Sequence, residues 1–266
     1  MPHGSAHAAD TRSAAAKARP GTPAQSALDF GCVVEKYTDT ALHFEVEKLP
    51  HLLERHLPRG PLTFADFGCG DGPLFRILVA GGHIGPGRAV YALDLEPARL
   101  ARVSARFPWI ETVVASVDHV PAIGDESLQF VCSTMVLEHV PDERAFLNEI
   151  HRVLRPGGRA YLTTVFKKSW AWYFRRRDGE TLLDPSHLRE YTDVGVFRAL
   201  LVEEGRFRIV ALERSQLWFP LLDPVLFRVV PRVPGLARRA SLLVRLRAAK
   251  VPIPGYYALE VVLERI

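Results

Sequence analysis

The sequence predicts a doubly wound α/β fold with a mainly parallel sheet, because three observations agree. Between residues 62 and 165, short apolar strand patterns alternate with segments of helical periodicity. A glycine-rich turn follows the first of these strands, and residues 128–133 form a continuous apolar run typical of a strand buried on both faces. Such alternation favours parallel strands joined by right-handed crossovers.

Local signals define each element in turn. A helix with apolar spacing over 40–56 is interrupted by Pro50. Gly81 closes the helix after the glycine-rich turn, Pro97 begins the next helix, and Asp142 caps the one after the long apolar strand. From these signals we predict strands at 62–67, 89–93, 111–115, 128–133, 159–165, 207–213 and 257–263, and helices at 74–80, 97–107, 142–154 and 193–204. Between the last two strands no pattern is clear.

The size and composition suit one soluble domain. The 266 residues are 48% hydrophobic, and the net charge of +4 favours anionic ligands or surfaces without naming one. The three cysteines are scattered, which fits a reducing, cytoplasmic compartment. Residues 1–27 have the composition of a disordered tail rather than of a signal or transit peptide, and no run reaches the roughly 18 apolar residues of a membrane-spanning helix. We therefore expect a tail over 1–27 and a single domain over 28–266.

The glycine-rich turn points to a ligand other than a dinucleotide. A dinucleotide loop has its third glycine five residues after the first, and here that position is Pro73. The carboxylate of Asp66, which precedes the turn, repels phosphates but suits an ammonium group. Asp94 ends the second strand, where a carboxylate can accept hydrogen bonds from ribose hydroxyls. A tight turn and a helix cap are the structural alternatives, but the two acids together favour a nucleoside ligand that carries an ammonium group.

Four motifs carry a resemblance to a known family. They are Asp66-Phe67-Gly68-Cys69-Gly70-Asp71-Gly72, Tyr91-Ala92-Leu93-Asp94, Val136-Leu137-Glu138-His139-Val140 and Leu154-Arg155-Pro156-Gly157-Gly158. Together they make residues 62–165 resemble the class I S-adenosylmethionine-dependent methyltransferases, within the subgroup of the type 11 methyltransferase domain. The resemblance implies a Rossmann-like sheet of seven strands in the order 3-2-1-4-5-7-6, with the last strand antiparallel.

The resemblance also implies a cofactor and the residues that bind it. The cofactor would be S-adenosyl-L-methionine, with its methionine end at Asp66 and the glycine turn, its ribose at Asp94, its adenine on Leu95 and beside residues 116–118, and its sulfonium near the end of the fourth strand. The implied binding residues are Asp66, Gly68, Gly70, Gly72, Asp94, Leu95, Ser116, Val117, Asp118, Ser133 and Thr134.

The candidate catalytic residues are two histidines. Methyl transfer is an in-line displacement that requires alignment of donor and acceptor, and a general base is needed only when a hydroxyl or phenol must lose its proton. His139 follows the fourth strand and could act on the acceptor or hydrogen-bond the next turn. His187 could position an acceptor or brace its loop. No cluster of His, Cys or carboxylate residues has metal-ligand spacing, so we expect no metal.

Two late insertions, 166–190 and 215–255, are expected to cover the acceptor site. The first interleaves basic and aromatic residues, and the second mixes aliphatic residues with arginines. We rank a cover over the active site first, contact with an anionic membrane second and RNA third, because an RNA surface would be more polar. The expected activity is methylation of a small, hydrophobic or lipid-like acceptor on oxygen, carbon or nitrogen by a cytoplasmic enzyme that can touch a membrane. A regulatory or scaffold protein and an RNA methyltransferase are the alternatives, while an oxidoreductase is disfavoured by Pro73 and Asp66.

Overall fold

The computed structural model describes residues 48–229, 232, 233, 235 and 240–266, so the predicted tail over 1–27 and the first part of the helix predicted at 40–56 lie outside the described residues. The strands are β1 (Phe64–Phe67), β2 (Val90–Asp94), β3 (Glu111–Val114), β4 (Leu128–Thr134), β5 (Leu154–Lys167), β6 (Arg175–Arg177), β7 (Glu180–Leu182), β8 (Phe207–Pro220) and β9 (Lys250–Arg265). The helices are α2 (His51–His56), α3 (Phe75–Ala80), α4 (Pro97–Arg106), α5 (Glu143–Val153), α6 (Val194–Leu201), the 3-10 turn η2 (Glu203–Gly205), α7 (Asp223–Val229) and α8 (Ala240–Arg247).

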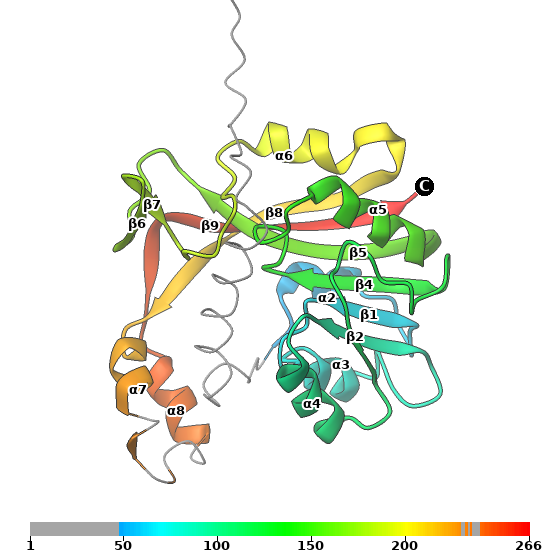
Figure 1. The fold of residues 1–266 in the computed structure, drawn as a ribbon, viewed down its shortest axis with the longest axis horizontal. Coiled ribbons are helices and arrows are strands. Elements are labelled where there is room, and N and C mark those ends of the chain that lie inside the picture. The colour runs from blue at the N-terminus through cyan, green and yellow to red at the C-terminus, as the bar shows by residue number, and fades with distance from the viewer. Residues whose placement is uncertain (1–47, 230–231, 234, 236–239) are drawn as a thin grey trace, which may run out of the picture.

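The main sheet has seven strands in the order β3-β2-β1-β4-β5-β9-β8. The strands from β1 to β5 pair in parallel, whereas β9 runs antiparallel to both β5 and β8. Figure 1 shows these strands running across the page, with β5, β4, β1 and β2 one below the other. The predicted strand order and the antiparallel last strand are thereby confirmed.

Helices cover both faces of the sheet, because neighbouring residues of a strand point to opposite sides. In β1, Phe64 belongs to a core formed with α2, α3 and α4, whereas Ala65 and Phe67 belong to a second core formed with α5 and α6. Leu100 of α4 and Phe146 of α5 are buried in the first and second of these cores. Burial on both faces explains why β1 and β4 appear in the sequence as continuous apolar runs.

The predicted elements of the first two-thirds agree with the structure to within a few residues. The largest difference there is β5, which begins at Leu154 rather than at 159, because the chain pairs with β4 on both sides of an irregular register between Leu128 and Phe130. The helix predicted at 193–204 ends at Leu201, and Glu204 then adopts a φ of 59° inside η2.

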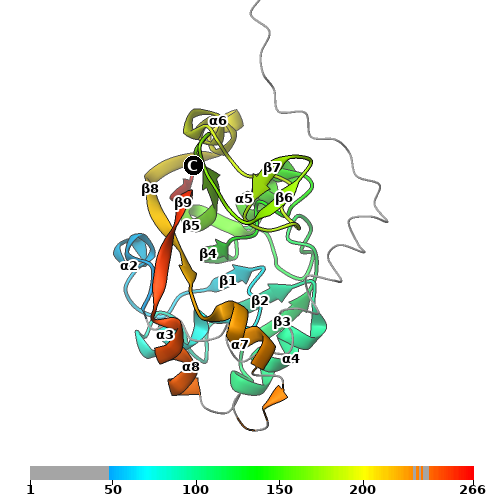
Figure 2. The ribbon, with the colours of Figure 1, turned by 90° about the vertical axis from the view of Figure 1, so that its left-hand side faces the viewer.

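The last third differs more from the sequence prediction. The strands predicted at 207–213 and 257–263 are extended to β8 and β9, which pair from Phe207 and Arg265 as far as Pro220 and Lys250. Their far ends leave the body of the sheet and carry α7 and α8, which Figures 1 and 2 place at the end of this ribbon. The β6–β7 hairpin, α7 and α8 were not predicted. No helix among the described residues is long and apolar enough to cross a membrane.

Candidate functional site

The glycine-rich turn leaves β1 at the carboxyl edge of the sheet. Gly68, Gly70 and Gly72 have φ values of 74°, 56° and 69°, in the region that glycine adopts without strain. At Gly68 the surroundings add a second requirement, since a Cβ atom there would lie 2.5 Å from Cγ2 of Val136. The turn therefore needs glycine both for its backbone conformation and for the close approach of the segment after β4.

Asp94 connects this turn to the end of β2. Its Oδ2 accepts a 2.8 Å hydrogen bond from the Gly70 N–H, and its Oδ1 accepts a 3.0 Å hydrogen bond from the Glu96 N–H. The carboxylate does not cap α4, because Glu96 is the cap and accepts from the Ala98 N–H. A carboxylate oxygen can accept more than one hydrogen bond, so each oxygen of Asp94 retains acceptor capacity for a ligand.

Asp66 lies at the base of the turn and is 1% exposed. Its Oδ1 has no hydrogen-bond partner among the described residues. Burial, helped by the negative charge of Asp94, raises the pKa of Asp66 to about 7. A buried carboxylate oxygen without a partner is costly, and a cationic ligand group would relieve that cost.

The remaining predicted cofactor residues surround the same edge. Leu95 is 53% exposed, Ser116 is exposed and Asp118 is half-buried, whereas Val117 is buried. The pairing of Asp94 with Val114 brings the ends of β2 and β3 together, and with them the residues predicted to meet the adenine. The nucleoside-binding roles of these residues remain predictions.

The predicted sulfonium-side residues differ from each other in their surroundings. Ser133 is buried, and its hydroxyl donates a 2.8 Å hydrogen bond to the Phe67 carbonyl. This contact joins β4 to β1, so the Ser133 hydroxyl serves the sheet. Thr134 is half-buried at the end of β4. The roles of both residues toward the sulfonium remain predictions.

A cluster of acidic and basic side chains beside the glycine turn was not predicted from the sequence. Asp71 accepts a hydrogen bond from Arg102, and its other oxygen lies 3.6 Å from Nε of Arg99. Both arginines stand on α4, three residues apart, so one face of this helix holds the turn. Their spacing on the helix that follows β2 is the signal that could have identified them.

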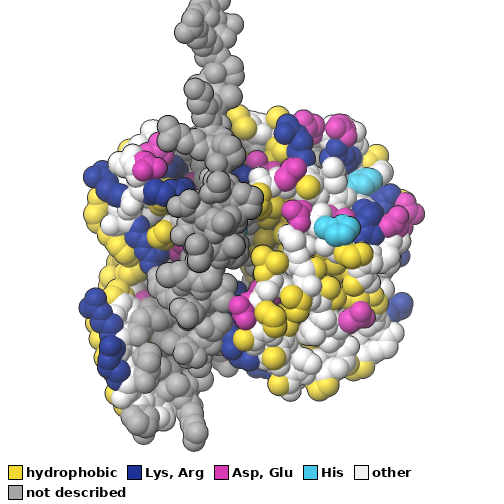
Figure 3. Space-filling view, viewed as in Figure 1, with side chains coloured by type: hydrophobic (Ala, Val, Ile, Leu, Met, Phe, Trp, Pro, Cys, Tyr) yellow, Lys and Arg dark blue, Asp and Glu magenta, His cyan; other side chains and the backbone are white. Residues whose placement is uncertain are grey.

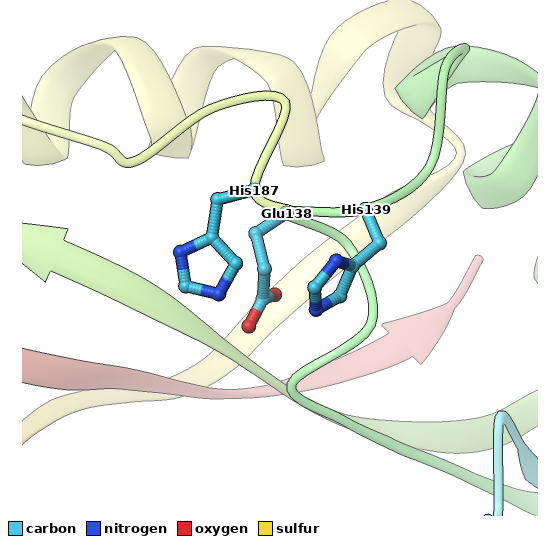
Figure 4. Close-up of side chains that lie close together, drawn as sticks. All are labelled: Glu138, His139 and His187. Atoms are coloured by element: carbon cyan, nitrogen blue, oxygen red, sulfur yellow. The ribbon is translucent and has the colours of Figure 1, made fainter. Parts of the chain in front are cut away.

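Three further side chains meet beyond the end of β4. Glu138 and His139 follow that strand, and His187 comes from the loop before α6. Figure 4 shows the Glu138 carboxylate beside the two imidazole rings, whose centroids lie 4.9 Å apart in an edge-to-face arrangement. One possible metal-ligating atom of each residue lies within 4.8 Å of the other two. The structure thus brings together the two predicted catalytic histidines and a carboxylate that the sequence did not single out.

Burial dominates the electrostatics of this cluster. Glu138 is fully buried and its pKa is raised to about 7, while burial and the neighbouring His187 lower the pKa of His139 to about 4. Both shifts favour the neutral forms. The expectation that the chain has no metal site rested on sequence spacing, which gives no sign that His187 lies beside residues 138 and 139.

The two predicted insertions border the cluster. In the first, Lys168 and Trp172 donate backbone hydrogen bonds of 2.9 and 3.1 Å to the carbonyls of Gly255 and Pro254, at the start of β9. Glu190, which follows the cluster's loop, accepts a 3.3 Å hydrogen bond from the Tyr256 hydroxyl of the same strand. These contacts bring both segments beside the histidines, although their role as a cover over an acceptor remains a prediction.

Comparison with known proteins identifies relatives. Residues 65–162 match the family described as a methyltransferase domain. The chain is 33% identical, over 103 residues, to a probable S-adenosylmethionine-dependent methyltransferase of Mycolicibacterium smegmatis; the match covers 39% of this chain and 38% of that protein. It is 30% identical, over 128 residues, to a ubiquinone biosynthesis O-methyltransferase of Pseudomonas paraeruginosa, and this match covers 46% of this chain and 52% of that one. The chain thus spans about half the length of these relatives, or less.

A solved structure extends the likeness over nearly the whole chain. It is the 1,6-didemethyltoxoflavin-N1-methyltransferase of Burkholderia thailandensis, with bound 1,6-didemethyltoxoflavin and S-adenosylhomocysteine. It shares 22% sequence identity with this chain at a TM-score of 0.57, over 94% of this chain and 92% of that one. The seven-stranded sheet described above is the Rossmann-like fold of such methyltransferase structures.

Proposed function

We propose that the chain transfers a methyl group from S-adenosyl-L-methionine to a small, hydrophobic or lipid-like acceptor. Residues 65–162 support this, because they belong to the class I S-adenosylmethionine-dependent methyltransferases. The observation that carries the proposal is the buried carboxylate of Asp66, with one oxygen lacking a partner, beside a glycine turn fastened by Asp94. The ammonium group of the donor's methionine end would supply that partner. A dinucleotide would instead bring phosphates to a site that holds two carboxylates.

The residues of the chain would mainly align the reactants. Asp66 and the backbone at Gly68 and Gly70 would hold the methionine end, while Asp94 would accept hydrogen bonds from the ribose hydroxyls. The exposed side chain of Leu95 would pack against the adenine. The donor already carries its leaving group, so the transfer needs the acceptor atom in line with the methyl–sulfur bond and the exclusion of water.

The acceptor would lie on the side of the sheet where β4 and β5 end. The predicted catalytic residues His139 and His187 stand there, bordered by the insertions 166–190 and 215–255. The buried apolar cluster formed by Val165, Tyr173, Ile253 and Tyr256 joins the two insertions to β5 and β9.

Binding and transfer can be tested separately with the full chain. We expect calorimetry to detect S-adenosylhomocysteine binding and no comparable binding of NADH, because the turn suits an ammonium group and not a pyrophosphate. Incubation with donor labelled on its methyl group and metabolite extracts should then yield a labelled small molecule. Tight NADH binding without S-adenosylhomocysteine binding would refute the proposal, and cofactor binding without transfer to any extract would favour a regulatory role.

We also propose that one end of the molecule touches anionic membranes. Large apolar side chains are exposed there, including Trp172 at 59%, Trp218 at 54% and Leu221 at 50%. The ring of Phe174, in the same loop as Trp172, lies 5.8 Å from that of Phe219 in β8, so the loop and the β8–β9 ribbon form one surface. Figure 3 shows Lys and Arg side chains among hydrophobic ones along the left-hand margin, where Figure 1 places β6, β7, α7 and α8. Exposed aromatic and basic side chains together suit the interface of an anionic bilayer.

Co-sedimentation with liposomes tests this contact. We expect the chain to sediment with vesicles that contain phosphatidylserine and not with purely zwitterionic ones, and to be released as salt screens the charges. The variant Trp172→Ser/Trp218→Ser should lose most of this binding, because aromatic side chains anchor at the interface. The control Trp109→Phe changes a partly buried tryptophan that packs in the core near α4, and should bind normally. Equal sedimentation of all three proteins, or none with anionic vesicles, would contradict the proposal.

A further inference from the structure

The cluster beyond β4 resembles a metal site in the way that its side chains are held. His187 is 4% exposed, and its Nδ1 lies 2.8 Å from Oε1 of Glu190. Glu190 is itself fixed, because its Oε1 also accepts a 2.7 Å hydrogen bond from the Leu183 N–H. The Nδ1–H of His187 therefore donates to a buried carboxylate, so Nε2 is the nitrogen that carries the lone pair. A carboxylate that orients an imidazole in this way is the usual partner of a metal-bound histidine.

His139 is oriented by the neighbouring loop in the same sense. Its Nδ1 lies 3.3 Å from both the carbonyl oxygen and the hydroxyl oxygen of Ser186. The Ser186 hydroxyl donates a 2.7 Å hydrogen bond to Asp184, so toward His139 it can only accept. The proton of His139 therefore resides on Nδ1, and Nε2 is the nitrogen of this ring that carries the lone pair.

Glu138 completes the set with a carboxylate oxygen. Its Oε2 accepts a 2.9 Å hydrogen bond from the Thr164 hydroxyl, while Oε1 is buried and has no hydrogen-bond partner among the described residues. In Glu138 and His187 one atom is thus held by the protein while a second can face an ion, and Nδ1 of His139 is held in the same way. These conditions recur in metal sites, where one atom binds the ion and the other is fixed by the surrounding protein.

We propose that Glu138, His139 and His187 bind one divalent transition-metal ion. Their possible ligand atoms lie within 4.8 Å of one another, and ligand bonds of about 2.1 Å would require the side chains to close up slightly. Two imidazoles and one carboxylate suit Zn²⁺, Fe²⁺ or Mn²⁺, whereas Mg²⁺ and Ca²⁺ prefer oxygen ligands. Three protein ligands leave a position open for a further ligand. This proposal replaces the sequence-based expectation that the chain has no metal.

The open position suggests which acceptor the enzyme takes, a step that rests on the proposed function. An acceptor hydroxyl bound to the ion would lose its proton to solvent more readily. Its oxygen would then form a bond to the methyl carbon while the carbon–sulfur bond breaks and its electron pair stays on sulfur. The two histidines would act through the ion, and oxygen would be favoured over carbon as the atom that is methylated.

Metal binding can be measured without any acceptor. The full chain, without an affinity tag and stripped with EDTA, would be titrated calorimetrically with ZnCl₂, MnCl₂ and MgCl₂, and its metal content measured after dialysis. We expect one Zn²⁺ or Mn²⁺ per chain and much weaker Mg²⁺ binding. The variant His187→Ala should abolish this binding, and Glu190→Gln, which only loosens the orientation of His187, should weaken it at least tenfold. The control His51→Ala removes an exposed histidine of α2 and should bind the ion normally.

S-adenosylhomocysteine binding separates the two proposals and checks the fold of each variant. Ion binding without nucleoside binding would refute the proposed function but would still support the metal site. The metal proposal is overturned if the wild-type chain binds no ion in a saturable one-to-one manner. It is also overturned if His187→Ala and Glu190→Gln both retain wild-type affinity for the ion while still binding S-adenosylhomocysteine.

Discussion

Replacing Asp94 with alanine should weaken S-adenosylhomocysteine binding by roughly a hundredfold, or about 3 kcal/mol. The variant would lose the carboxylate proposed to accept hydrogen bonds from the ribose, and each such bond to a charged group contributes about 1.5–3 kcal/mol. It would also lose the acceptor of the Gly70 and Glu96 N–H groups, so the glycine turn would be held less firmly. Titration calorimetry of the two proteins measures the difference directly.

The matched control is Asp193→Ala at the start of α6. Asp193 likewise accepts from two backbone N–H groups, those of Gly195 and Val196, but it lies at the helix cap and not at the glycine turn. Its loss should lower stability by about 1 kcal/mol and leave nucleoside binding unchanged. Wild-type affinity in Asp94→Ala, or an equal loss of affinity in both variants, would remove the ribose role.

The sequence predicted the sheet, and the meeting of the glycine turn with two acids at one edge of it, because these signals are local. The glycine turn follows β1, Asp66 lies near the end of β1 and Asp94 ends β2. Parallel strands bring their carboxyl ends to one edge of the sheet whatever the details of packing. The continuous apolar runs of β1 and β4 directly indicate strands that are buried on both faces. The predicted strand order came from the resemblance, and the pairing in the structure agrees with it.

The late third of the chain could not be predicted in the same way. β8 and β9 continue beyond the sheet as a two-stranded ribbon. Apolar residues such as Trp218 and Val251 are exposed there, so this part of the sequence does not show the apolar alternation that marks a strand. The helix α7 starts at Asp223-Pro224, in the stretch between the last two strands where the sequence shows no clear pattern. His187 lies beside Glu138 only because its loop folds back onto the segment after β4. A 2.9 Å hydrogen bond from the Leu188 N–H to the Glu138 carbonyl holds the two segments together. Such a contact leaves no periodic trace in the sequence.

Replacing Asp66 with asparagine should separate stability from binding. In the free protein the pKa of Asp66 is raised to about 7, from an ordinary value of 3.8. Below about pH 4 the carboxyl group is neutral in both the folded and the unfolded chain, so its titration does not change the free energy of unfolding. Between pH 4 and 7 the unfolded chain releases the proton while the folded chain keeps it, and the free energy of unfolding falls as the pH rises. Asparagine has no such loss, so at pH 8 the variant should be more stable than the wild type by up to about 4 kcal/mol.

Ligand binding should change in the opposite direction. The ammonium group of S-adenosylhomocysteine would pair with ionised Asp66, so the wild-type affinity should rise from pH 6 to pH 8, whereas that of Asp66→Asn should be weaker by tenfold or more at pH 8 and nearly independent of pH. Denaturant unfolding and calorimetry at both pH values test the two halves, with Asp193→Asn as a control that keeps a good helix cap and should alter neither. A variant that is less stable than the wild type at pH 8 would mean that Asp66 is satisfied within the free protein. A variant that binds as tightly as the wild type would mean that the ammonium group lies elsewhere. A gain in stability with a loss of binding is the result expected of a carboxylate that is kept buried, at a cost to the fold, for the sake of a cationic ligand.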